Sequence, residues 1–146
     1  AYAHVAHDCV IGNNVIMVVQ TMLGGEVTVD DWAIIGGGSG AHQFVRIGAH
    51  VMMAGGSVAV MDIPPYVRAG RSPLSFMGIN SIGLERRGFS KEKIAEIHEI
   101  YRVIYNTGRN RTQALGFIEE TFPPTIERDL IIKFFRTSER GVIRVR

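Results

Sequence analysis

The residues of this chain that could do acid–base chemistry begin with His7 and Asp8, which are adjacent in the sequence. An imidazole titrates at about pH 6.5, so it can accept and return a proton near neutrality, and a neighbouring carboxylate can orient it. Gly25 follows His7 by 18 residues, and Gln43 follows Gly25 by another 18. A glycine can present its backbone N–H to a reacting oxygen. An exposed histidine taken alone is more often a solvated surface residue, so these residues form a site only if the fold brings them together.

A six-residue repeat that runs from residue 5 to residue 64 gives the 18-residue spacing a structural meaning. Its first position holds a bulky apolar residue or alanine, and its fifth position is small or β-branched throughout. This period predicts short parallel strands joined by tight corners, in a parallel β-helix with three hexapeptides per coil. Residues 18 apart then stack at the strand spacing of about 4.8 Å. His7, Gly25 and Gln43 therefore share one outward-facing column. A β-sandwich of short strands, the alternative, does not predict a repeat in unbroken phase.

The repeat stops at Pro64 and Pro65, neither of which can donate to a strand ladder. We therefore predict β-helix coils over residues 1–66, an extended connector over 67–89 and an α-helical domain over 90–146. The helices are expected to have Ser90, Thr112 and Thr125 as N-caps, and the last of them to end near Gly141. Because the chain begins inside a coil, we expect it to be the C-terminal part of a longer chain with further coils.

Composition narrows the possible functions. The 146 residues are 46% hydrophobic and 21% charged, which is enough for a packed core, and no apolar run approaches the length of a membrane span. A single cysteine excludes an internal disulfide framework and a cysteine-based zinc site, and no secretory signal is visible, so the cytoplasm is the expected compartment.

Charge is divided unevenly along the chain. Residues 1–64 contain one Lys or Arg against five Asp or Glu, whereas residues 65–146 contain fifteen against nine. An acidic partner should therefore dock on the second half, attracted by Lys91, Lys93, Arg102, Arg109 and Arg111. Nucleic acid is not expected, because no basic patch is interleaved with aromatic residues.

Several segments together resemble the acyl-carrier-protein-dependent UDP-N-acetylglucosamine O-acyltransferases, which open lipid A biosynthesis. They are His4–Cys9, Ile35–Gly37, Ala41–Phe44, Ile47–Met52, Asp62–Tyr66 and Asn80–Phe89. The resemblance implies a left-handed parallel β-helix followed by helices, assembled as a homotrimer with active sites between subunits. It also implies transfer of a 3-hydroxyacyl group from acyl carrier protein to the 3-hydroxyl of UDP-N-acetylglucosamine, with no metal and no organic cofactor.

The resemblance also implies roles for individual residues. His7 would deprotonate the sugar hydroxyl, the Gly25 amide would hold the thioester oxyanion, and Asp8 could orient His7. We leave a direct contact between Asp8 and His7 open, because adjacent side chains point apart in a strand. Substrate-binding roles are implied for six further residues: His4, His42, Gln43, Asn80, Arg86 and Arg87, the last three toward the nucleotide and diphosphate.

A third column of the repeat, Val19, Gly37 and Gly55, would form the groove for the acyl chain, with Gly55 near its far end. Two positions depart from the family pattern. Glu26 replaces a substrate-contacting histidine, so the sugar that is recognised could differ, and Ile82 stands where relatives often have a glutamate. We interpret His50 as structural and His98 as solvated.

Other functions stay open at this point. An asparagine often follows the catalytic histidine in the related UDP-3-O-acylglucosamine N-acyltransferases, so Asp8 favours the O-acyltransferase over these and other hexapeptide acyltransferases. A β-helix carbonic anhydrase would need His4, His7 and His42 to hold zinc, which their spacing does not favour. A trimeric scaffold without catalytic activity is the remaining alternative.

Overall fold

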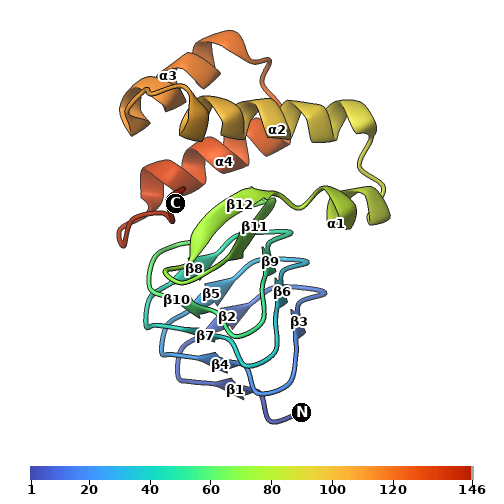
Figure 1. Ribbon diagram of the computed structural model, residues 1–146, viewed down its shortest axis with the longest axis vertical. Helices are drawn as coiled ribbons and strands as arrows, with labels where there is room; N and C mark the ends of the chain where they lie inside the picture. Colours follow the sequence, from blue (N-terminus) through green and yellow to red (C-terminus); the bar gives the residue numbers. More distant parts are fainter. Residues whose placement is uncertain (146) are drawn as a thin grey trace.

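The computed structural model describes residues 1–145. Residue 146, the last of the predicted helical domain, lies outside the described residues. In these residues, two-residue parallel strands stack into a triangular β-helix with helices at its C-terminal end (Figure 1). The strands are β1 (His4–Val5), β2 (Val10–Ile11), β3 (Ile16–Met17), β4 (Met22–Leu23), β5 (Thr28–Val29), β6 (Ile34–Ile35), β7 (Gly40–Ala41), β8 (Arg46–Ile47), β9 (Met52–Met53) and β10 (Val58–Ala59).

Three sheets form the sides of the triangle. The first sheet has the order β1-β4-β7-β10, the second β2-β5-β8, and the third contains β3, β6 and β9. The register pairs His4 with Met22 and Met22 with Gly40, so residues 18 apart stack. The predicted parallel β-helix with three hexapeptides per coil is therefore confirmed.

Three corners join the sheets, and each has its own chemistry. The histidine corner (residues 6–9, 24–27 and 42–45) joins the first sheet to the second. The tryptophan corner (residues 12–15, 30–33 and 48–51) joins the second to the third. The glycine corner (residues 18–21, 36–39 and 54–57) joins the third back to the first. At the histidine corner Asp8, Glu26 and Phe44, at the fourth position of their repeats, have φ of 59°, 59° and 67°. This left-handed conformation turns the chain between strands.

The interior of the β-helix is filled by the two positions that the repeat marks as apolar or small. Val29 and Ile47 at the first position are each 1% exposed, and Val27 and Val45 at the fifth are fully buried. In the first coil the same positions are open, because Val5 is 44% and Ile11 37% exposed. The packed core therefore begins in the second coil and continues toward the helices.

The segment 67–89, predicted as an extended connector, contains more structure than expected. Strand β11 (Val67–Gly70) pairs in parallel with β9 and antiparallel with β12 (Ser75–Ile79), so the third sheet continues past Tyr66. Helix α1 (Ser81–Arg86) follows, and here the extended prediction is wrong. The Asn80 side chain accepts the Gly83 N–H and so caps a helix too short to give a periodic apolar pattern.

Three further helices cover the end of the β-helix: α2 (Lys91–Asn106), α3 (Arg111–Thr121) and α4 (Ile126–Thr137). Ser90 and Thr125 are the N-caps of α2 and α4, as predicted. The prediction for Thr112 is wrong, because Asn110 caps α3 through a capping box with Gln113. Helix α4 ends at Thr137, earlier than the predicted end near Gly141. No helix within residues 1–145 is long and apolar enough to cross a membrane.

The buried carboxylate of Asp62 joins the β-helix to the C-terminal segment. Its Oδ1 accepts the Arg46 backbone N–H at 2.8 Å, and its Oδ2 accepts the Ser138 hydroxyl at 2.6 Å. The Asp62 N–H donates to the Gly141 carbonyl at 2.8 Å. The loop after α4 is therefore held against β8 and β10, beside the histidine corner (Figure 1).

Candidate functional site

His7 and Asp8 form an exposed pair at the histidine corner. The His7 Nδ1 lies 3.1 Å from the Asp8 Oδ2, and the two side chains are 68% and 75% exposed. The positive φ of Asp8 turns the chain here, so the two adjacent side chains do not point apart as they would in a strand. A carboxylate accepts a hydrogen bond from Nδ1–H, and in the neutral imidazole with this contact Nε2 has the lone pair. The contact that the sequence left open is present.

The His7 imidazole lies directly against Gly25. A Cβ added to Gly25 would come within 2.5 Å of both His7 Cε1 and His7 Nε2, so only glycine accommodates the ring in this position. The Glu26 N–H donates to the His7 carbonyl at 2.9 Å, and the Phe44 N–H donates to the Gly25 carbonyl at 3.1 Å. Within residues 1–145 the Gly25 N–H itself donates no backbone hydrogen bond. A basic nitrogen and an unused amide are thus adjacent.

The remaining residues predicted near His7 surround this pair on the same chain. Gln43 stacks above Gly25, and Glu26 stacks above Asp8, one coil further along. His42 follows β7 at the same corner, whereas His4 lies on β1 of the first sheet. All four side chains are exposed. The histidine corner therefore presents imidazole, carboxylate and amide groups to one side.

The residues predicted to contact the nucleotide lie at a different corner. The Asn80 Nδ2 donates to the His50 carbonyl at 3.0 Å, and an Arg87 Nη lies 3.2 Å from the His50 Nδ1. The Arg86 side chain is exposed and makes no hydrogen bond or ion pair within residues 1–145. Asn80, Arg86 and Arg87 are thus at the tryptophan corner, and a single chain does not bring them to His7.

His50 is packed into an aromatic stack rather than free to react. Its ring centroid lies 6.4 Å from that of Trp32, 5.7 Å from that of Tyr66 and 5.1 Å from that of Phe89. Burial, and after it the Arg87 charge, together lower the pKa of His50 to about 4. The ring is therefore neutral at pH 7, in agreement with the structural role expected for it. The 18-residue spacing of the repeat already predicts that Trp32 stacks with His50. The approach of Phe89 depends on tertiary packing and could not be predicted from the repeat.

The glycine corner has the bare column that the sequence predicted. A Cβ on Gly37 would contact the Val19 Cγ1 at 3.5 Å, and one on Gly55 would lie 3.2 Å from the Gly37 carbonyl oxygen. Val19, Gly37 and Gly55 therefore stack along the axis. The column precedes the strands of the first sheet, whereas His7 follows them, so the two lie at opposite ends of these strands.

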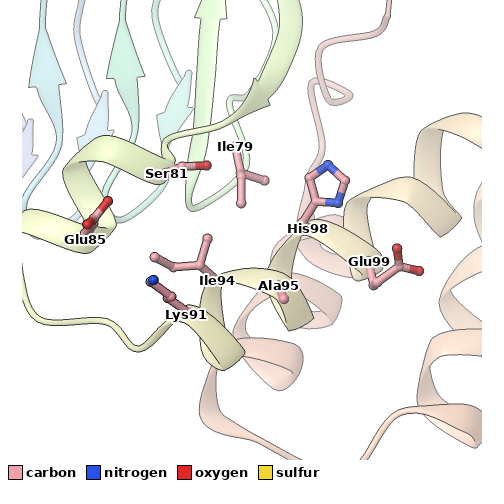
Figure 2. Close-up of a pocket in the computed structure, with 8 residues that line it drawn as sticks. All are labelled: Ile79, Ser81, Glu85, Lys91, Ile94, Ala95, His98 and Glu99. Carbon is pink, nitrogen blue, oxygen red and sulfur yellow. The ribbon is translucent and has the colours of Figure 1, made fainter.

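A pocket of about 430 Å³ opens elsewhere, between α1 and α2 (Figure 2). Ile79 and Ile94 form its apolar part, and Glu85, Lys91 and His98 stand around it. None of the predicted site residues lines this pocket. His98 is exposed, as expected. Residues 1–145 contain no group of three or more His, Cys, Asp or Glu residues that could hold a metal ion.

A β-helix of hexapeptides that carries an exposed histidine against a glycine is the arrangement expected of a hexapeptide-repeat acyltransferase. Comparison with known proteins narrows this class. Residues 62–143 match the family described as UDP N-acetylglucosamine O-acyltransferase, domain 2. The chain is 44% identical to the acyl-[acyl-carrier-protein]–UDP-N-acetylglucosamine O-acyltransferase of Burkholderia lata over 148 residues, 99% of this chain and 56% of the relative.

Solved structures agree with the sequence relatives. The UDP-N-acetylglucosamine acyltransferase of Bacteroides fragilis superposes with a TM-score of 0.95 at 49% identity, over 97% of this chain and 56% of that one. The Francisella novicida enzyme gives 0.93 at 35% identity, over 98% of this chain and 52% of that one. The chain therefore belongs to the UDP-N-acetylglucosamine O-acyltransferase family, and it spans about half the length of these relatives.

Proposed function

We propose that this protein transfers a 3-hydroxyacyl group from acyl carrier protein to the 3-hydroxyl of UDP-N-acetylglucosamine, the first step of lipid A biosynthesis. The contact between the His7 imidazole and Gly25 is the observation that carries the proposal. It places a base next to an amide that the β-helix does not use, which acyl transfer from a thioester requires. The name of the Burkholderia lata relative, which gives acyl carrier protein and UDP-N-acetylglucosamine, supports this choice of donor and acceptor.

The proposed reaction uses His7 twice. The His7 Nε2 removes the proton of the sugar 3-hydroxyl, while Nδ1–H stays bonded to Asp8. The sugar oxygen attacks the thioester carbonyl, and the Gly25 N–H donates to the oxyanion that forms. When the intermediate collapses, the carbon–sulfur bond breaks and the carrier thiolate takes the proton from His7. Protons and electrons balance without an oxidant or reductant, and the proposed mechanism includes no metal and no organic cofactor.

Two copies of the chain are proposed to complete each site. His4, His7, Gln43 and Glu26 come from the histidine corner, whereas Asn80, Arg86 and Arg87 lie at the tryptophan corner. A homotrimer in which the corners of neighbouring subunits face each other would bring the sugar hydroxyl to one subunit and the diphosphate to the next. The same packing would let the acyl chain reach a glycine corner. The compartment that we propose for this reaction is the cytoplasm.

An assay with defined substrates tests the proposal. The protein is incubated with 3-hydroxyacyl carrier protein and UDP-N-acetylglucosamine, and the nucleotide sugar is analysed by mass spectrometry and by alkaline hydrolysis of the ester. We expect a UDP-3-O-acyl sugar. Transfer to the amine of UDP-3-O-acylglucosamine alone would indicate the N-acyltransferase, and transfer to neither acceptor would contradict the proposal.

A further inference from the structure

A hollow of about 480 Å³ lies beside the histidine corner, between the second sheet and the end of α4. Thr28, Phe44 and Arg46 line it from the β-helix, and Lys133, Thr137 and Arg140 line it from α4 and the following loop. Phe44 directly follows Gln43, and its N–H donates to the Gly25 carbonyl. The wall of this hollow is therefore continuous with the candidate catalytic site on the same chain.

The two arginines of the hollow are held in place by uncharged groups. An Arg46 Nη donates to the Thr137 hydroxyl at 2.9 Å, and the guanidinium lies 4.3 Å from the centre of the Phe134 ring. The Arg140 Nε donates to the Val60 carbonyl at 2.9 Å. These contacts hold the guanidinium groups without neutralising them, and both side chains line the hollow.

The cations of the hollow are not paired with carboxylates, whereas several other cations of the helical domain are. Lys93, Arg102 and Arg136 form ion pairs with carboxylates at 2.8–3.6 Å. Within residues 1–145, the side chains of Arg46, Lys133 and Arg140 form none. Fixed and unpaired guanidinium groups are suited to a phosphate, whose oxygens match their planar fork.

The acidic residues of the hollow leave these cations free. Asp62 is 1% exposed, and its two oxygens are taken by the Arg46 backbone N–H and the Ser138 hydroxyl. Glu139 is exposed at the rim and forms no ion pair within the described residues. The Arg46 charge also acts on Asp30: it lowers the pKa of that carboxyl, against the larger raising effect of burial.

We infer that this hollow binds the phosphate of the phosphopantetheine arm that carries the acyl group, an inference that rests on the proposed function. With the thioester at Gly25, the arm has to leave the site along the chain surface, and Phe44 gives its alkyl portion an apolar wall next to Gln43. The fixed arginines then meet its phosphate. The diphosphate of the nucleotide is the less suitable ligand, because Arg86 and Arg87 lie at another corner.

Acyl donors with and without the phosphate, assayed with the full-length protein, test this assignment. We would compare 3-hydroxyacyl-phosphopantetheine with 3-hydroxyacyl-pantetheine as donors for the wild type and for the double variant Lys133→Gln/Arg140→Gln. Both residues are exposed, so the fold should persist, and thermal unfolding checks this. Losing charged hydrogen bonds should raise KM for the phosphorylated donor roughly tenfold or more. KM for the pantetheine donor and for the UDP-sugar should stay unchanged.

The matched control is Arg136→Gln, which removes a cation of α4 that is paired with Glu119 at 2.8 Å. It should leave KM for both donors unchanged. Equal changes with both donors, a rise in KM for the UDP-sugar, or an effect seen only with the intact carrier protein would overturn the assignment. If the wild type transfers no acyl group from any donor, the proposed function fails instead. Calorimetric titration with phosphopantetheine and with pantetheine then tests the hollow directly: equal affinities in the wild type would overturn it as well.

Discussion

The histidine corner and the tryptophan corner are built from the same hexapeptide and use their polar groups in opposite ways. At the histidine corner, His7 is mostly exposed, contacts the Asp8 carboxylate and lies against Gly25. At the tryptophan corner, His50 is surrounded by aromatic rings and accepts a hydrogen bond from Arg87. The repeat thus fixes where a side chain emerges, and the neighbours in its column decide what it can do.

The two histidines stand at different positions of the repeat, His7 at the third and His50 at the fourth, and the residues stacked with them also differ. Above His7 comes Gly25, which leaves space for the imidazole and bares an amide, whereas below His50 comes Trp32, whose ring covers one face of the imidazole. A polar group that has no internal partner has no structural role to explain it, so it is the stronger candidate for chemistry. This comparison leads to four predictions.

The largest expected effect is that of His7→Ala on turnover. Because general bases contribute about 10²–10⁴-fold, kcat should fall by at least two orders of magnitude. The free energy of unfolding should change by less than about 0.5 kcal/mol, since the side chain is exposed. Steady-state kinetics and urea titration measure the two quantities. Near-normal turnover would remove His7 from the mechanism.

Stacking of His7, Gly25 and Gln43 follows from the six-residue period alone, because the sheet register fixes it. The hydrogen bond from His7 to Asp8 could not be predicted, because it depends on the left-handed conformation of Asp8 at the corner. The positions of Asn80 and Arg87 at the tryptophan corner could not be predicted either, because helix α1, which Asn80 caps, is too short to show a helical period in the sequence. The hollow beside Phe44 could not be predicted from the sequence, because tertiary packing brings its lining residues together from residues 28–62 and residues 133–140.

The next largest effect should come from Gly25→Ala, which keeps the amide and adds only a methyl group. That methyl would lie 2.5 Å from His7 Nε2, so the imidazole has to move. A displacement of about 1 Å can cost roughly 10²-fold, and we expect kcat to fall by about this factor. The control is Gly40→Ala on β7, where the nearest atom, the Met22 carbonyl oxygen, is 3.4 Å away. Equal activity of the two variants would show that the close contact at Gly25 has no catalytic value.

A smaller effect is expected from the titration of His50 at the other corner. Its pKa is about 4 in the folded chain and about 6.5 when unfolded, so between these values only the unfolded state takes up the proton. The stability that the neutral His50 contributes is therefore fully present above about pH 6.5, and it is lost as the pH falls toward 4. The full shift corresponds to about 3 kcal/mol, and partial exposure of the ring should reduce this to about 1–2 kcal/mol.

Urea unfolding at pH 7 and at pH 5, for the wild type and for His50→Gln, isolates this contribution. The variant should be less stable at pH 7 but should lose less stability on acidification, because glutamine does not titrate. His7→Gln is the matched comparison at the exposed corner. The same acid dependence in wild type and His50→Gln would mean that the aromatic stack does not hold His50 neutral.

The smallest expected effect extends the comparison to the glycine corner, whose bare column we assigned to the acyl chain. Gly55 does not have a positive φ, and a Cβ there would lie 3.2 Å from the Gly37 carbonyl oxygen, so a side chain fits with a small local shift. A methionine at this position would extend outward over the far end of the column that Val19 and Gly37 continue. Gly55→Met should therefore shift the preference toward shorter 3-hydroxyacyl donors by several fold in kcat/KM. Because His7 is not altered, kcat with the short donors should stay at the wild-type value. The measurement is a donor series from short to long chains, with thermal unfolding as the test of folding. An unchanged preference in a folded variant would place the acyl chain along the first sheet or the histidine corner instead, and the glycine column would then serve only the tight turns of the β-helix.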